Sequence, residues 1–290
     1  MDREYVENAK LEIEEWESQK PGFLNHVGDL VLIPAQHVAS RLIPGFVQSA
    51  ATKAVQKSVE KLSGAAQLIS DEEEIQRYLE EELEKHKDEL RAADEVARHY
   101  WNWNIACGIG EGGATGALGL MGLAADIPAL LTLSLRSIQQ VGRSYGYDMQ
   151  AWEEREYAMH ILRVGSASSF KSKMEFLVSL KHVEQVLVKV SVEKMGAALA
   201  QKEIGRYSLL GVVTQFAEKL GVHLTRRKAL QMVPIIGAVV GASFNAVFVN
   251  DVGQAAYMLY RRRRIAELEG PKLANPKGGG VSEDEDVVVQ

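Results

Sequence analysis

Seven polar residues interrupt two stretches that are otherwise apolar or rich in small side chains, and they are the groups best placed to do chemistry. They are Glu111, Asp126, Arg136, Tyr145 and Asp148 in the first stretch, and Asn245 and Asp251 in the second. Burying a charge without a partner is expensive, so we expect these groups to pair, to cap helices or to face a cavity. Pairing is the favoured interpretation. Convergence on a cavity would instead create a binding site, or a hydrolase-type site near Asp126 and Asp148.

Two details bear on this interpretation. Asp126 stands directly before Ile127-Pro128, a pattern that predicts a helix N-cap with proline in the first turn. Gly108-x-Gly110-x-x-Gly113 satisfies the dinucleotide pattern, but no β-branched run precedes it and glycines continue at 116, 119 and 122. This spacing favours close helix packing over a phosphate loop. We expect Gly116 and Gly241 to lie at such close contacts.

Metal and cofactor chemistry have little support in the sequence. The seven histidines are scattered without a His-Glu-x-x-His pair, and the one cysteine, Cys107, lies among apolar residues. The sequence therefore predicts no metal site and no cofactor.

A single cysteine cannot form an intramolecular disulfide, which fits a reducing cytosol. The N-terminal region is acidic and amphipathic and does not resemble a signal peptide, so we expect a cytoplasmic protein.

The elements that must position these residues are helices. Apolar residues recur at helical spacing, and 290 residues with 46% hydrophobic content are enough for one large globular domain or two tightly packed ones. An acidic helix is expected to start at Ser70 and to bury one stripe, formed by Ile75, Leu79, Leu83 and Leu90. The other helices are expected at residues 3–18, 24–40, 45–69, 150–167, 171–198 and 203–220.

The two apolar stretches, Ile105–Asp148 and Met232–Arg264, follow one scheme of glycine and small residues, a proline and an apolar helix with a polar end. We therefore predict an all-α, multi-helix bundle of about ten helices, with two central Gly-rich apolar helices related as a weak internal repeat. The domain should span residues 1–269. Residues 270–290 combine proline, three consecutive glycines and four consecutive acids, which predicts a disordered acidic tail.

These stretches also resemble a known family. The run GGATGALGLMGLAADIPALLTLSLR with the later YGYD, the run VPIIGAVVGASFNAVFVNDV with its basic end, and the opening WESQKP are similar to the EcsC family over roughly residues 10–266. The family is named for a gene beside a transporter operon and has no settled activity. The resemblance therefore implies no catalytic residues that can be carried over.

A membrane role has to be weighed because Met232–Asn250 contains 19 residues without a charge, close to the length that spans a bilayer. An integral protein with helical hairpin spans is one alternative. Against it, the stretch contains proline, glycine and asparagine, and basic residues flank both of its ends. The balance favours central helices of a soluble bundle.

The basic run Arg261, Arg262, Arg263 and Arg264 should lie in the last turns of the second central helix, where cations oppose the helix dipole. Such a cluster beside an apolar helix also attracts anionic lipid, so we expect these arginines to face a membrane. Nucleic acid is disfavoured, because the run lacks interleaved aromatic residues. The sequence thus indicates a membrane-associated accessory or lipid-binding protein, with an anionic membrane surface or a membrane protein complex as partner and no demonstrated catalysis.

Overall fold

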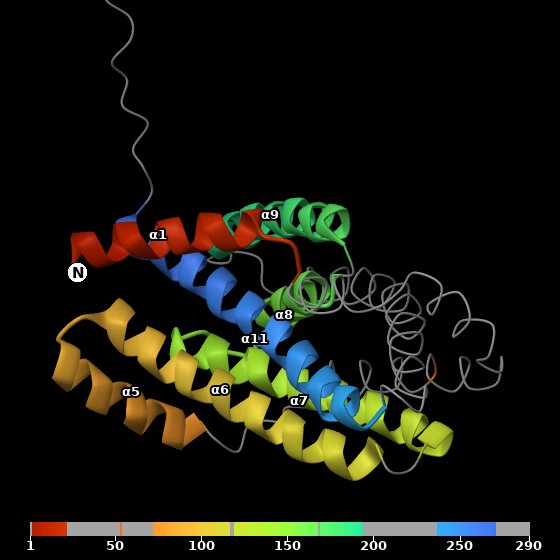
Figure 1. Ribbon diagram of the computed structural model, residues 1–290. Coiled ribbons are helices and arrows are strands. Elements are labelled where there is room, and N and C mark those ends of the chain that lie inside the picture. The colour runs from red at the N-terminus through yellow and green to blue at the C-terminus, as the bar shows by residue number, and fades with distance from the viewer. Residues whose placement is uncertain are drawn as a thin grey trace, which may run out of the picture.

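The computed structural model describes residues 2–21, 53, 72–116, 119–167, 169–193 and 237–270. This part of the chain forms seven α-helices and no strand (Figure 1), so the all-α prediction is confirmed. The helices are α1 (Arg3–Ser18), α5 (Glu72–His86), α6 (Glu89–Gly116), α7 (Gly119–Ser144), α8 (Trp152–Gly165), α9 (Phe170–Glu193) and α11 (Gly237–Glu269). The helices expected at residues 24–40, 45–69 and 203–220, and the tail from residue 271, lie outside the described residues.

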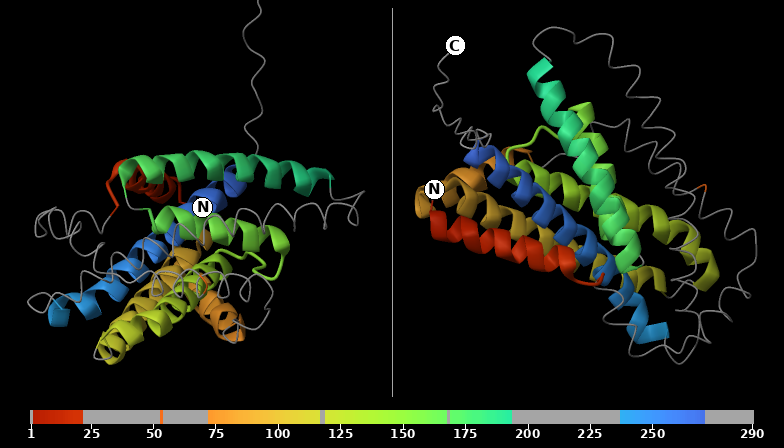
Figure 2. Two further views of the ribbon diagram at one scale, coloured as in Figure 1. Left: turned by 90° about the vertical axis from the view of Figure 1, so that its right-hand side faces the viewer. Right: turned by 90° about the horizontal axis from the view of Figure 1, so that it is seen from above.

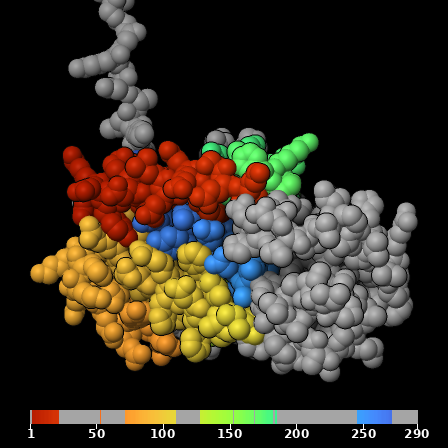
Figure 3. Space-filling model, viewed as in Figure 1, coloured from red at the N-terminus to blue at the C-terminus, as the bar shows by residue number. Residues whose placement is uncertain are grey.

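The long helix α11 forms the axis of the bundle. It packs against α6, α7, α8 and α1, while α9 packs on α8. The middle of α11 is rich in small and apolar residues, and the helix buries five of them completely, namely Val249, Val252, Ala255, Ala256 and Leu259. Complete burial of a side chain such as Leu259 contributes about 1.5–3 kcal/mol. The space-filling view shows α11 enclosed between α1 and α6 on one face (Figure 3).

The first apolar stretch does not form a single central helix. Its residues up to Gly116 complete α6, and those from Gly119 to Ser144 form α7. The two helices run antiparallel side by side, and α11 lies against both of them (Figure 1). The centre of the bundle therefore has three long helices, with the two Gly-rich stretches meeting where α6 and α7 face α11.

The acidic helix and the helix after it meet at an elbow at Lys87. We expected one apolar stripe from Ile75 to Leu90, and this is wrong, because α5 and α6 are separate helices. Lys87 has a φ of 53°, in the left-handed region that breaks a helix. Asp88 then accepts a hydrogen bond from the backbone N–H of Arg91 at 3.1 Å, as an N-cap does. Local capping thus overrides a periodicity that continues across the break.

Two glycines allow α11 to touch its neighbours directly. A Cβ at Gly253 of α11 would lie 2.3 Å from Cδ1 of Trp101 on α6. A Cβ at Gly165 of α8 would lie 2.6 Å from Cα of Val252. Both distances are shorter than any real contact of a Cβ atom, so these two crossings require glycine.

The dinucleotide-like glycines lie inside a helix. Gly108-x-Gly110-x-x-Gly113 falls within the continuous helix α6, and a Cβ at Gly108 would lie 3.4 Å from Val249 on α11. A phosphate loop needs a strand before the glycines and a turn within them. The helix-packing interpretation is therefore confirmed at Gly108, whereas the surroundings of Gly116 and Gly241 lie outside the described side chains.

The predicted cap at Asp126 is wrong. Helix α7 begins at Gly119, so Asp126 and Pro128 both lie within it. The preceding residues include Leu, Met and Ala, which favour helix and extend α7 toward its N-terminus. Pro128 removes one backbone donor but does not end the helix, and the Thr132 hydroxyl donates to the Pro128 carbonyl at 2.8 Å.

Candidate functional site

Three of the polar residues that could have formed an active site, Tyr145, Asp148 and Asp251, lie apart from one another. Tyr145 is buried, and its hydroxyl donates to Asp94 of α6 at 2.6 Å. Asp148 lies exposed in the turn after α7, where its carboxylate accepts from the Gln150 N–H at 2.9 Å. Asp251 lines a small cleft between α1, α8 and α9. The structure therefore sends Tyr145, Asp148 and Asp251 into three different surroundings.

Two of the other four candidates have described side chains. Arg136 is partly buried on α7. Asn245 is buried on α11, and its backbone carbonyl oxygen lies 3.5 Å from the position that a Cβ atom would take at Gly108. Glu111 and Asp126 belong to α6 and α7, but their side chains lie outside the described part of the chain. The binding roles of these four residues stay predictions.

Tyr145 instead joins a buried charge cluster around Asp94, a residue that the sequence did not single out. Asp94 is fully buried and accepts hydrogen bonds from the hydroxyls of Tyr5 and Tyr145, each at 2.6 Å. Its carboxylate also pairs with the guanidinium of Arg261 at 2.8 Å. The cluster thereby connects α1, α6, α7 and α11 through one acidic group.

The electrostatics of this cluster keep the tyrosines protonated. Burial raises the pKa of Tyr145 well above its ordinary value, and the negative charge of Asp94 raises it further. Burial also raises the pKa of the Asp94 carboxyl, while Arg261 and the two tyrosine hydroxyls oppose the rise. A buried acidic group with three donors around it is satisfied by its neighbours, which suits a structural role.

The four consecutive arginines of α11 reach in different directions, because successive residues of a helix are turned by roughly 100°. Arg261 pairs with Glu12 of α1 at 2.5 Å in addition to Asp94 of α6. Arg262 bridges α1 and α9 through its ion pairs with Glu17 and Glu184, the second at 2.7 Å. The N-terminal helix and the C-terminal helix are tied together by both side chains.

The next two arginines pair with α8 and α6. Arg263 makes a two-pronged pair with Glu154 of α8, at 2.7 and 2.8 Å, and its guanidinium lies 4.2 Å from the ring centre of Tyr147. Such paired contacts are the strongest kind of arginine-carboxylate interaction. Arg264 pairs with Glu89 of α6 at 3.0 Å and is the most exposed of the four. Together the four side chains, the arginine hub, link α11 to α1, α6, α8 and α9.

The arginine hub bears on the membrane prediction. The placement of Arg261–Arg264 near the C-terminal end of α11 is confirmed, but their contact with a membrane stays a prediction. Arg261 is only 2% exposed, and each guanidinium faces at least one protein carboxylate. Internal pairing offsets the positive charge that anionic lipid would attract.

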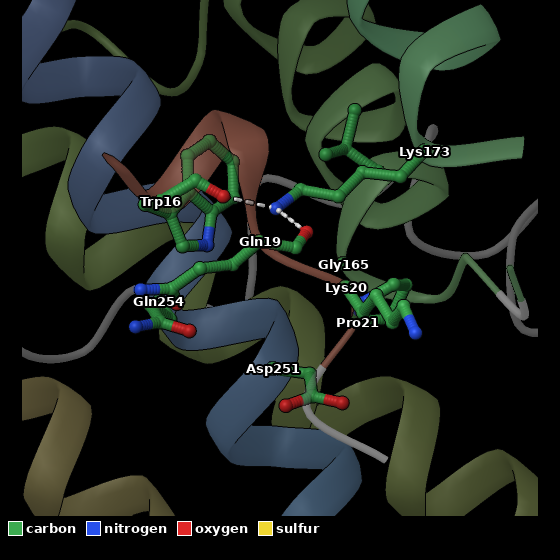
Figure 4. Close-up of a pocket in the computed structure, with 9 residues that line it drawn as sticks. Trp16, Gln19, Lys20, Pro21, Gly165, Lys173, Asp251 and Gln254 are labelled. Atoms are coloured by element: carbon green, nitrogen blue, oxygen red, sulfur yellow. Dashed lines mark hydrogen bonds between the residues drawn. The ribbon is translucent and has the colours of Figure 1, made fainter. Parts of the chain in front are cut away.

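A second polar site lies in the small cleft at the end of α1, and it too was missed by the sequence reasoning. Lys173 of α9 is 4% exposed, and its ammonium donates to the backbone carbonyls of Trp16 and, at 3.1 Å, of Gln19 (Figure 4). The same ammonium lies 4.2 Å from the ring centre of Trp16. Burial lowers the pKa of Lys173 to about 8, although Glu17 and Asp251 oppose the fall.

This arrangement suits a structural cap better than a reaction site. The last carbonyls of a helix lack intrahelical partners, and a buried lysine supplies the missing donors at the end of α1. The cleft has a volume of about 50 Å³, enough for a few water molecules. One sequence signal could have found it, because Lys173, Leu177 and Leu180 share one helical face and are all buried.

Within the described residues, no cluster of His, Cys, Asp and Glu is arranged to hold a metal ion. None of the helices in this part of the chain is long and apolar enough to cross a membrane.

Comparison with known proteins places the chain among similar sequences. The sequence pattern of the EcsC protein family matches residues 7–265. "Uncharacterized protein YdbA" of Bacillus subtilis (strain 168) is 32% identical over 276 residues, which cover 91% of this chain and 94% of that protein. "Protein EcsC" of the same organism is 23% identical over 229 residues, covering 79% and 83% of the two chains. No solved structure matches the chain.

Proposed function

This chain belongs to the EcsC protein family, and we propose that it works in the cytoplasm as an accessory or lipid-binding protein on a membrane surface. Its direct partner in this proposal is the membrane itself, and a membrane protein complex is the alternative partner. The proposal concerns binding and assembly. It assigns no reaction to the chain.

The contacts made by the residues of the family-like motifs support a binding function over a catalytic one. The Trp16 carbonyl receives the Lys173 ammonium, Tyr145 donates to Asp94, and Arg261 neutralises the same carboxylate. These residues of the family-like stretches therefore hold helices together. A general acid or base must instead reach a substrate atom within hydrogen-bond distance.

The single observation that carries the membrane proposal is a group of exposed apolar side chains on α9. Large apolar side chains that are exposed in the described residues are Leu11, Leu83, Trp103, Ile109, Phe170, Met174 and Val178. Isolated exposed residues of this kind are normal on a protein surface, whereas a contiguous group marks an interaction site. The last three of these seven residues lie on one helix at a spacing of four.

Cell fractionation tests the proposal independently of any particular surface. We expect the full-length protein to sediment with membranes and to be released by an alkaline carbonate wash, as a peripheral protein is. Retention after the wash would indicate an integral protein. Complete recovery in the soluble fraction, at native expression level and low salt, would contradict the proposal.

A further inference from the structure

We infer that the outer face of α9 is the surface by which the protein meets a lipid bilayer, an inference that rests on the proposed membrane association. The described half of α9 has two distinct sides. Lys173, Leu177 and Leu180 point into the bundle and are buried. Phe170, Met174 and Val178 lie on the outside, with exposed fractions of 41%, 38% and 57%. We call these three residues the α9 stripe.

The position of α9 leaves the stripe free to approach a flat surface. Seen from above, α9 crosses the top of the molecule with no described helix over it (Figure 2). Its contacts with other helices come chiefly from α8 beneath it. A helix that lies flat, with one apolar side outward and charged residues beside it, is the form that inserts into the interfacial region of a bilayer.

The charges on α9 are sorted in a way that favours an anionic lipid surface. Lys171 and Lys181 are exposed beside the stripe, and a lysine can extend its ammonium to lipid phosphates while its stem covers apolar surface. Glu184 is turned inward and is neutralised by Arg262 at 2.7 Å. Among the described side chains of α9, only Glu175 adds a negative charge to the outer side.

The neighbouring helix α1 sets a limit on this attraction. Its outward residues include exposed glutamates, among them Glu4, Glu7 and Glu14. These acids would repel anionic lipid if α1 lay equally deep. The apolar stripe, and not the net charge of the face, therefore has to supply most of the binding, and we expect binding to decline only partly in high salt.

Vesicle flotation with full-length protein tests this surface. The vesicles consist of equal parts phosphatidylcholine and phosphatidylglycerol, with phosphatidylcholine alone as the comparison. We expect the unaltered protein to float with the mixed vesicles. In a Met174→Glu/Val178→Glu variant, binding to the mixed vesicles should fall by about tenfold or more, because a carboxylate is costly to transfer into an apolar layer. Lys171→Gln/Lys181→Gln should lower binding to the mixed vesicles more than to phosphatidylcholine.

Ile109→Glu on α6 is the matched control, because Ile109 is 51% exposed and α6 lies on the far side of the bundle from α9. It should float like the unaltered protein, and circular dichroism should show all variants folded. Equal flotation of the α9 variant and the unaltered protein would overturn the inference. Failure of the unaltered protein to float, despite sedimenting with cell membranes, would also overturn it and would point to a membrane protein as the partner. Absence from cell membranes would instead contradict the proposed function.

Discussion

Arg261 and Arg264 have the same chemistry and lie one helical turn apart, yet their surroundings differ strongly. The Arg261 side chain is 2% exposed and faces the fully buried Asp94, whereas that of Arg264 is 32% exposed and pairs with glutamates at the surface. The energetic role of an arginine depends on whether its removal leaves a buried charge. For this reason the arginine hub cannot be treated as four equivalent cations.

The first prediction separates these two residues. Arg261→Gln should lower the free energy of unfolding by about 3–5 kcal/mol, because it leaves the buried Asp94 carboxylate without its cation. Arg264→Gln should cost about 0–1 kcal/mol, as expected for a surface pair. Urea denaturation followed by circular dichroism measures both values. Similar small losses for the two variants would contradict the buried cluster.

A second residue-scale prediction concerns His160 of α8. Burial and, to a smaller extent, the positive charge of the nearby Arg163 lower the pKa of His160 to about 4. The folded protein therefore keeps this side chain neutral at a pH where the unfolded chain binds a proton. Stability should fall as the pH drops from about 6.5 toward 4, by about 3 kcal/mol across the full window, because one pKa unit corresponds to 1.4 kcal/mol.

The control for this prediction is His160→Gln, which keeps a polar side chain but does not titrate. Thermal melts at intervals between these pH values should show a flatter profile for the variant than for the unaltered protein. Parallel profiles would mean that other groups cause the acid sensitivity, and that His160 is not the residue responsible.

At the scale of elements, helix contacts decide which glycines matter. Gly253→Ala should destabilise the protein by about 1–3 kcal/mol, because the new methyl group would overlap Trp101 on α6. Gly108→Ala should be neutral or slightly stabilising, since its Cβ would meet Val249 at 3.4 Å and alanine favours helix by about 0.8–1 kcal/mol over glycine. Chemical denaturation of the pair tests this contrast. Equal losses of stability in the two variants would contradict the close contact between Gly253 and Trp101.

Element boundaries were predictable where a local signal marked them. The first helix was expected at residues 3–18 and is observed at Arg3–Ser18, because the Asp2 carboxylate caps its start and its apolar residues keep one face. The break at Lys87 escaped prediction because the apolar stripe continues across it. The start of α7 was also not predicted, since Asp126 and Pro128 have the residue pattern of a helix N-terminus although they lie inside α7.

At the scale of the whole molecule, the arginines near the end of α11 are paired with carboxylates inside the bundle, whereas the α9 stripe lies on the outside. Sequence periodicity predicted the helices, and it predicted that the apolar residues described in α7 and α11, such as Leu131 and Val252, would be buried. It could not predict that Asp94, Glu154 and Glu184 would meet the arginines, because such pairing depends on how distant helices align. The exposed stripe escaped for the same reason, since a sequence shows apolar spacing but not which side a neighbour covers.

The internal pairing of the arginines also determines how they should behave on lipid. Because their guanidinium groups are paired within the protein, Arg264→Gln should leave flotation with phosphatidylglycerol vesicles within about twofold of the unaltered protein, as expected when one screened surface charge is removed. The more buried arginines are unsuitable for this test because their loss affects folding. A loss of flotation comparable to that of the α9 variant would restore the arginine run as a membrane contact.

The central claim, that α9 and not the arginine end meets the membrane, is tested most directly by an environment-sensitive fluorophore. The label is attached through Val178→Cys in a Cys107→Ser background, with Arg264→Cys in the same background for comparison. On adding phosphatidylglycerol vesicles, the account predicts a blue shift and a rise in emission at position 178 and little change at position 264. A shift at position 264 alone, or at neither position while the protein is bound, would contradict it.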